Sequence, residues 1–512
     1  MQLDESHAAL KSKMQEYLAG EASATDLKHA SAPLGVYQQR NDLFMARLRI
    51  TGGHLDLTDL RTVVEVIANN GIGYAHLTTR QDIQLQDVPA ENVCDVVQTC
   101  NGRGLPFRGG GGNTFRNIAA SPASGIGADG LFDVMPYAKS LNDLILDWDK
   151  AFQLPRKLKI GFYDSPGEEL SAAVQDLGFA ARVVDGKRGF KVYGGGGMGR
   201  ESAVGVTLFD FLPVDRVPAC TLAMTELFYD HGNRENRNQA RIRFIVKRLG
   251  EQKFVELFQE YFAKADPQTG SFPAWDPDLA EAVAALQIPP GEEPSAQSYR
   301  DWVARAVSPT HFGADIATVR VFFPGGNLSA AQLGSLADLA ELCGCSFLRL
   351  TPTQDVLVPL IRRDALPSVY SFLKSAFPET DVLLDSLVGH VVTCVGSTVC
   401  KIGILDSPAA GECVARALDE MLAKHPDLGP VAATEVLDCI RISGCPNSCA
   451  GHFVAKIGLQ GQKTKVDGVM EPVYQVFTRS GDALAISEPV GGLVMEAEIA
   501  DTVRELILAQ LG

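Results

Sequence analysis

Two segments of the chain repeat one another at a constant offset of 273 residues, and about forty positions align without a gap. The first segment reads LFMARLRI, then LTDLRTVVEVIANNG, then AHLTTRQDIQLQDV, which is the order strand, helix, strand. Two unrelated units that share a Gly-Gly turn are the alternative, but they leave the matches far from that turn unexplained. The repeat therefore predicts an internal duplication. The matched residues include Arg47 with Arg320, Gly52–Gly53 with Gly325–Gly326, Leu55 with Leu328, Leu60 with Leu333, Leu77–Thr78 with Leu350–Thr351, and Gln81–Asp82 with Gln354–Asp355.

One mismatch inside the repeat bears on function. Arg80 of the first copy corresponds to Thr353 of the second. A cation kept in only one copy indicates one functional site shared by the two halves.

The longer regions after each repeat contain apolar strands and helices such as PACTLAMTELFYDHG and GECVARALDEMLAK. We therefore expect two similar α/β halves around a pseudo-twofold axis, preceded by a helical lead-in over residues 1–40. Proline and glycine mark residues 265–310 as a linker, with a short helix near Leu279–Leu286.

Composition narrows the functional classes. Asp and Glu number 62 and Lys and Arg 46, for a net charge of −16, so we expect neither a nucleic-acid partner nor an anionic membrane surface. The N-terminus carries Asp4, Glu5 and Lys11 where a secretory signal needs an apolar run, and no apolar stretch approaches about 20 residues. A cytoplasmic location is expected, where the eleven cysteines stay reduced and serve packing, metal binding or catalysis.

Four of the cysteines form a specific pattern. Cys394 and Cys400 are a C-x5-C pair, Cys445 and Cys449 a C-x3-C pair, and 44 residues lie between Cys400 and Cys445. Four thiolates from two loops suit an iron–sulfur cluster. Structural zinc is the metal alternative, although it usually takes tighter pairs, and simple core packing is the other.

The second pair lies in the sequence GCPNSCAG. Pro446 has no backbone N–H, and the segment predicts a turn that leads into a helix start. Free N–H groups there would point at the cluster sulfurs and stabilise added negative charge.

With these cysteines, four further motifs make the chain resemble the sirohaem- and [4Fe-4S]-containing sulfite and nitrite reductases. They are LTTRQ at 77–81, NTFRN at 113–117, LPRKLK at 154–159 and the glycine run at 194–197. The resemblance spans residues 40–500 and implies an α+β fold in which each half has a ferredoxin-like half-domain and a larger α/β cofactor domain. The implied domains are 41–112 and 113–264 in the first half, and 311–384 and 385–512 in the second.

The resemblance also implies roles for individual residues. The cysteines would hold the cluster, and Cys449 would in addition bridge to the sirohaem iron. A cofactor with many carboxylates and an anionic substrate require nearby cations, which the motifs supply. The implied catalytic residues are Arg80, Arg116, Lys157 and Lys159, and the implied cofactor contacts are Gln81, Asn117, Gly195, Gly196, Asn447 and Cys449.

These residues lead to the hypothesis of six-electron reduction of sulfite to sulfide, with electrons from an external ferredoxin or flavoprotein reductase. Nitrite reduction to ammonia on the same cofactors is the alternative. The second lysine favours a dianion, since plant-type nitrite reductases tend to have Asn at the position of Lys159. An iron–sulfur electron-transfer or scaffold protein without haem is an alternative of another class, but such a protein needs no buried anion-site cations.

Two other motifs have weaker readings. The glycine run at 194–199 formally fits G-x-G-x-x-G, but the sequence VGVTLFDFLPVDRVP that follows predicts a strand and a loop rather than a Rossmann helix, so we expect these glycines to lie close to a bulky cofactor. NRENRNQARIRFIVKRLG predicts a helix with a basic face, either solvated or in contact with cofactor carboxylates or an acidic donor.

Overall fold

The computed structural model describes residues 3–265, 272–273, 279, 291, 294–383, 390–425, 439–479, 481 and 484–511. No helix in these ranges is long and apolar enough to cross a membrane. The short helix predicted near residues 279–286 lies almost wholly outside them.

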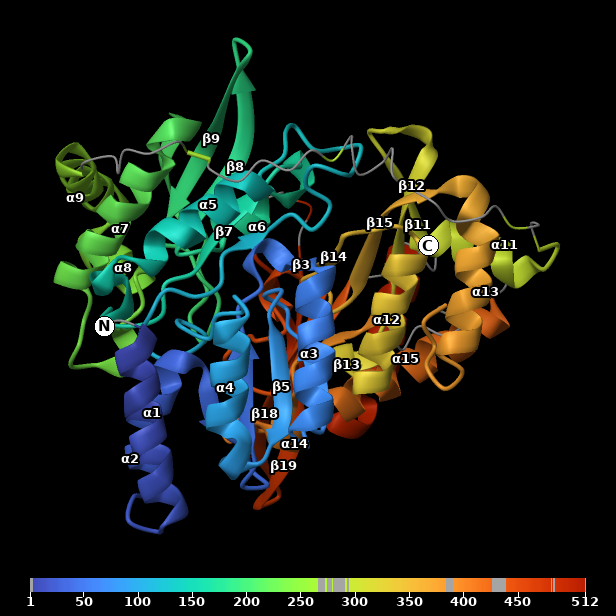
Figure 1. Ribbon diagram of the computed structural model, residues 1–512, viewed down its shortest axis with the longest axis horizontal. Coiled ribbons are helices and arrows are strands. Elements are labelled where there is room, and N and C mark those ends of the chain that lie inside the picture. The colour runs from blue at the N-terminus through green and yellow to red at the C-terminus, as the bar shows by residue number, and fades with distance from the viewer. Residues whose placement is uncertain are drawn as a thin grey trace.

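The duplication is visible as two five-stranded sheets that exchange a strand. The first sheet has the order β1-β2-β5-β4-β13 and the second β11-β12-β15-β14-β3, so each half lends one short strand to the other. Helices α3 and α12, at equivalent positions of the repeat, pack side by side across the middle of the molecule (Figure 1). One hydrophobic core runs through both sheets, which makes the two half-domains a single folding unit. The strands are β1 Val36–Gln38, β2 Phe44–Leu48, β3 His54–Asp56, β4 Tyr74–Leu77, β5 Ile83–Val88, β11 Val307–Thr310, β12 Gly313–Val321, β13 Asn327–Leu328, β14 Phe347–Leu350 and β15 Val356–Arg362; the helices are α3 Leu57–Asn69 and α12 Ala330–Leu342.

Two glutamines join the halves at equivalent positions. Gln81 donates through Nε2 to the carbonyl of Leu350, and Gln354 donates in the same way to the carbonyl of Leu77, at 3.0 and 3.2 Å. Each amide oxygen also accepts a backbone N–H from the first strand of the domain that follows, at Ala120 and at Thr393. The glutamines therefore connect four parts of the fold through buried hydrogen bonds.

Gly53 lies at this junction, and a substitution there tests how closely the two halves pack. Its φ is +73°, and a Cβ there would lie 2.3 Å from the carbonyl oxygen of Leu350. We expect Gly53→Ala to lower the free energy of unfolding by about 3 kcal/mol, since left-handed strain and overpacking add. Gly20→Ala is the matched control, because Gly20 has φ +77° but nothing within 4 Å of its Cβ position. Urea unfolding measures both, and equal losses would show that the junction is not crowded.

Each half then builds a larger mixed sheet, again on one plan. The orders are β10-β9-β8-β7-β6 and β16-β17-β18-β19-β20; in each sheet the first three strands in sequence are parallel and the last two antiparallel. Separate hydrophobic cores lie beneath them. The β8–β9 hairpin projects from the top of the molecule in Figure 1. The strands are β6 Ala119–Ala120, β7 Ile160–Tyr163, β8 Leu177–Val184, β9 Lys187–Gly194, β10 Val206–Pro213, β16 Val392–Thr393, β17 Ile440–Ser443, β18 Ile457–Val466, β19 Val469–Thr478 and β20 Glu488–Met495.

The helices predicted for the lead-in and for PACTLAMTELFYDHG and GECVARALDEMLAK are present. The lead-in forms α1 Leu3–Leu18 and α2 Ala24–Ser31. The two helical segments of the larger domains form α7 Val217–His231 and α15 Ser407–Lys424. The mixed α+β fold with repeated halves is confirmed, while the domain limits stay predictions. The remaining α-helices in the described ranges are α4 Val93–Gly102, α5 Met135–Leu146, α6 Glu169–Ala173, α8 Arg243–Leu249, α9 Glu251–Lys264, α11 Gln297–Ala306, α13 Leu366–Ala376, α14 Gly396–Val399 and α17 Ile499–Leu511.

Candidate functional site

The four cysteines of the predicted cluster follow two neighbouring parallel strands. Strand β16 pairs with β17, and Cys394 and Cys445 come just after the respective strands. Because parallel strands end at the same edge of a sheet, the two loops meet there. The Gly444 N–H points at the Cys394 sulfur at 3.4 Å, and the Ser407 hydroxyl lies 3.2 Å from the same sulfur.

The thiols of the two pairs lie near enough to influence one another. Burial, and next the charge of Cys449, raise the pKa of Cys394 to about 11. Burial also raises the pKa of Cys445; Asn447 opposes this by donating backbone and side-chain hydrogen bonds, while Cys449 and Cys400 add to it. The predicted N–H groups directed at sulfur are therefore present at Gly444 and Asn447.

The predicted helix start at Pro446 is wrong. Residues 444–451 form turns and bends, followed only by one turn of 3-10 helix at His452–Val454. Ser448 has φ +54° and Gly451 φ +83°, and such left-handed residues do not continue a right-handed helix. The N–H groups come from a tight turn instead.

Within the described ranges, no three His, Cys, Asp or Glu side chains are arranged to hold a single metal ion. A structural zinc takes four ligands around one ion, whereas a [4Fe-4S] cluster distributes its four thiolates over a four-iron cube.

Cys449 is exposed, and the backbone of its loop contacts the first half. The Thr79 hydroxyl, in LTTRQ, donates to the Cys449 carbonyl at 2.6 Å. Arg40 holds the other cysteine loop by donating to the carbonyls of Cys400 and Gly403 at 2.9 and 2.8 Å. The two halves therefore close against one another at the loops that carry Cys400 and Cys449.

The two lysines of LPRKLK lie at this closure. NTFRN and LPRKLK run side by side, with Phe115 opposite Leu158 and the Arg116 N–H donating to the Leu158 carbonyl. Burial, helped by neighbouring cations, lowers the pKa of Lys159 to about 7, and it lowers the pKa of Lys157 well below the usual value. The charge of Cys449 acts on both lysines in the opposite direction.

Arg80 and Arg116 are held by neutral groups. Arg80 donates to the Gln175 side chain and the Ile160 carbonyl at 2.9 and 2.7 Å, and its buried Nε has no partner. Arg116 donates to the carbonyls of Gly109 and Gly112 and to the Thr114 hydroxyl. Burial lowers the pKa of both guanidinium groups, that of Arg116 to about 10. Neither forms an ion pair with a described carboxylate, so their positive charge is left for an anion.

Asp176 and Arg49 were not predicted as site residues, and Arg241 was predicted only as a member of the basic segment. Arg241 forms a buried ion pair with Asp176 at 2.8 Å, and Asp176 also accepts the Lys159 N–H at 2.8 Å. Arg49 is buried against the Phe115 ring at 4.2 Å, and burial lowers its pKa to about 9. Only the density of arginine in LFMARLRI and NQARIRF hinted at them, because burial of an arginine leaves no periodic signal.

The polar residues predicted to contact the cofactor differ in how many of their hydrogen-bonding groups already have partners in the protein. Gln81 is fully buried, and its Nε2 already donates to three carbonyls, so the structure favours its joining role. Asn117 donates to the carbonyls of Ile50 and Arg80 while its buried Oδ1 has no partner. Asn447 is exposed beside Cys445. A direct cofactor contact of any of the three stays a prediction.

The glycine run packs mainly against the protein itself. A Cβ at Gly195 would lie 2.4 Å from Val246, and one at Gly196 would lie 2.3 Å from the carbonyl of Ala173. Strand β9 leads through a loop to the antiparallel β10, so the dinucleotide-binding alternative is excluded for this segment. Contact of Gly195 and Gly196 with a cofactor stays a prediction.

The basic segment is not one solvated helix. It forms a 3-10 turn at Arg237–Gln239 and the short α8, and both Arg241 and Arg243 are buried. Two nitrogens of Arg243, Nε and Nη1, have no partner, and its guanidinium lies close to Gly197 and Gly199. The reading as cofactor-facing cations is the one that this burial favours.

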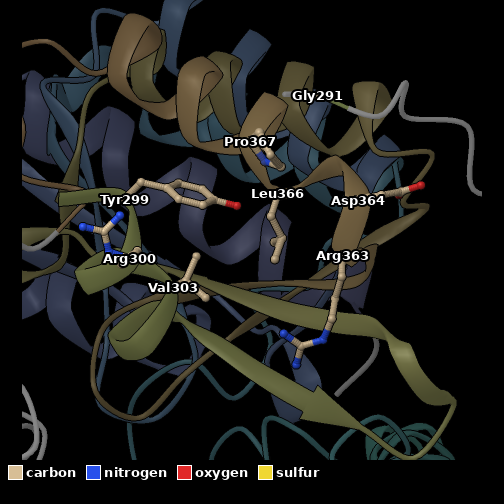
Figure 2. A pocket seen from close by; sticks show the side chains of 8 residues that line it. All are labelled: Gly291, Tyr299, Arg300, Val303, Arg363, Asp364, Leu366 and Pro367. Atoms are coloured by element: carbon tan, nitrogen blue, oxygen red, sulfur yellow. The ribbon is translucent and has the colours of Figure 1, made fainter. Parts of the chain in front are cut away.

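A separate pocket of about 390 Å³ lies beside α11 and the start of α13 and contains none of the predicted site residues (Figure 2). It is lined by Gly291, Tyr299, Arg300, Val303, Arg363, Asp364, Leu366 and Pro367.

Comparison with known proteins agrees with this architecture. The family model described as "Nitrite/Sulfite reductase ferredoxin-like half domain" matches residues 37–102 and 312–376, and the "Nitrite and sulphite reductase 4Fe-4S domain" matches 111–265. The chain is 28% identical to a ferredoxin–nitrite reductase of Synechococcus elongatus over 95% of this chain and 90% of the relative. It is 27% identical to a ferredoxin sulfite reductase of Mycolicibacterium paratuberculosis over 82% of this chain and 70% of the relative. The solved NirA protein of Mycobacterium tuberculosis has the same fold, with a TM-score of 0.78 at 22% identity over 98% of this chain and 91% of that one.

The chain belongs to the nitrite and sulfite reductase family of oxidoreductases. Enzymes of this family use sirohaem and a [4Fe-4S] cluster, and these are its cofactors. The residues present fit both groups, since the four cysteines lie in two adjoining loops with N–H donors, and the buried guanidinium groups of Arg80 and Arg243 keep N–H groups that no acceptor in the described part of the chain satisfies.

Proposed function

We propose that the chain reduces sulfite to sulfide with six electrons. Cys394, Cys400, Cys445 and Cys449 would hold the cluster, and Cys449 would also hold the sirohaem. The proposal rests above all on the hydrogen bond from the Thr79 hydroxyl to the Cys449 carbonyl at 2.6 Å, because it brings the cysteine loop of the second half against the LTTRQ motif of the first. When bound, the two groups supply an iron that takes the oxyanion and the electrons that reduce it.

The residues of the chain bind the anion and move protons. Arg80 and Arg116, already oriented by protein carbonyls and an amide, hold the substrate oxygens without reorganising. Lys159 gives a proton from Nζ, because a pKa of about 7 lets the ammonium donate and be replenished near neutral pH. The Asp176–Arg241 pair fixes the backbone of Lys159.

Nitrite reduction to ammonia is the second candidate, favoured by the printed names of several relatives. Steady-state turnover of both anions with one donor decides between them. We expect kcat/KM for sulfite to exceed that for nitrite by about ten-fold. A wild-type ratio below one would assign the enzyme to nitrite.

We further propose a ferredoxin as the electron donor, because relatives carry ferredoxin in their names. Reduced ferredoxin should support turnover when a flavoprotein reductase alone does not. The opposite pattern would contradict this proposal.

A further inference from the structure

Asp82 is a buried carboxylate at the cation-rich end of the first half-domain, and it forms no ion pair with any residue that the structure describes. The residue is only 4% exposed, and its Oδ1 has no hydrogen-bond partner in the described part of the chain. The Ile50 N–H hydrogen-bonds the carboxylate. Arg47, Arg49 and Arg80 act on it electrostatically, but none of them pairs with it.

The second copy of the repeat shows what this position does when it is purely structural. Asp355, the equivalent of Asp82, is fully buried and accepts Nε and Nη2 of Arg320, the first at 3.0 Å. Arg320 is the equivalent of Arg47, so the corresponding pair in the first copy would be Arg47 with Asp82.

In the first copy Arg47 binds other acceptors instead of Asp82. Arg47 lies opposite Gln84 across β2 and β5, whereas Arg320 lies opposite Leu357. With its amide oriented to satisfy its neighbours, Gln84 accepts Arg47 Nε at 3.1 Å, and Arg47 Nη1 donates to the Gly110 carbonyl at 2.8 Å. Leucine at 357 has no acceptor to offer. One difference in the repeat, glutamine for leucine, thus leaves Asp82 unpaired.

We propose that Asp82 sets the charge of the anion pocket and makes it select a singly charged oxyanion, so that sulfite enters as hydrogensulfite. This inference rests on the proposed function. The unpaired carboxylate offsets part of the charge of Arg47, Arg49 and Arg80 without blocking their donors. Its repulsion acts twice as strongly on a doubly charged anion as on a singly charged one in the same place.

The influences on the pKa of Asp82 are consistent with its role in setting the charge of the pocket. Burial raises its pKa, while the guanidinium groups of Arg47 and Arg49, at the end of β2, and of Arg80, before β5, lower it. Arg116, from the NTFRN segment, also senses its charge. An added anion opposes ionisation of Asp82, so dianion binding at high pH carries the largest electrostatic cost.

The test compares anion affinity in the holoenzyme of wild type and of Asp82→Asn. Nitrite is the singly charged probe throughout, and sulfite at a pH above its own second ionisation is the doubly charged probe. Dissociation constants come from the visible spectrum of the haem and from calorimetry, without turnover. We expect Asp82→Asn to lower the dissociation constant of nitrite about five-fold and that of the sulfite dianion about 25-fold, which is the square of the first value.

Asp355→Asn is the matched control, because it removes the same charge at the equivalent position of the repeat and is expected to leave both affinities unchanged. If Asp82→Asn does not load its cofactors, Asp82→Ser removes the charge and keeps a hydroxyl acceptor for the Ile50 N–H. Equal changes for the two anions, or weaker binding of both, would overturn the role of Asp82. A wild-type haem that binds neither anion would instead overturn the proposed function.

Discussion

Replacing Cys449 by serine is expected to reduce turnover by more than about a hundred-fold and to lower the iron and sulfide content of the purified enzyme. A direct ligand should matter more than the outer partners of metal ligands, whose loss costs roughly 10–100-fold. The position also joins the halves, since its carbonyl accepts the Thr79 hydroxyl, and this backbone bond survives the substitution.

Cys413→Ser is the control for this substitution. Cys413 lies on α15 as a free, half-buried thiol away from the four-cysteine pattern. It should retain both turnover and cluster content. A Cys449→Ser enzyme with normal metal content and normal turnover would remove Cys449 from the site.

Lys159→Met is expected to lower kcat by about a hundred-fold or more while sirohaem and cluster content stay normal, because general acids contribute roughly 10²–10⁴-fold. Methionine preserves the apolar stem and removes only the proton donor. Lys150→Met is the control, since Lys150 is an exposed partner of Glu226 at 2.5 Å.

The pH profile gives this prediction a second measurement. The pKa of Lys159 is lowered to about 7, so the ammonium form is present below that pH and is lost as the pH rises through it. Wild-type kcat should therefore fall on the alkaline side of about pH 7, and this limb should be absent from Lys159→Met. Unchanged turnover in the variant, or an unchanged alkaline limb, would show that another group delivers the proton.

Much of the fold followed from the repeat alone. The strand–helix order and the equivalence of the halves are present, but the segment AHLTTRQDIQLQDV, predicted as one strand, forms two antiparallel strands, β4 and β5. The exchange of β3 and β13 between the sheets was not foreseen, because strands of two or three residues carry no usable periodicity. The helix after Pro446 failed for a related reason: proline marks a turn and a helix start equally well, and only the φ values of Ser448 and Gly451 separate them.

For the site, the sequence by itself determined which chemistry is available. It supplies four thiols in two loops, and arginine and lysine motifs in one half only. The equivalent position in the other half can be uncharged, as Thr353 is. These are properties of residue type and spacing, which the chain carries before it folds. Tertiary structure alone decided which charges remain unpaired. Arg241 is neutralised by Asp176, while Asp82 is left single because Gln84 draws Arg47 away. Pairing depends on distances of a few ångströms between segments far apart in the chain, and in a buried site those distances set the energy of every charge.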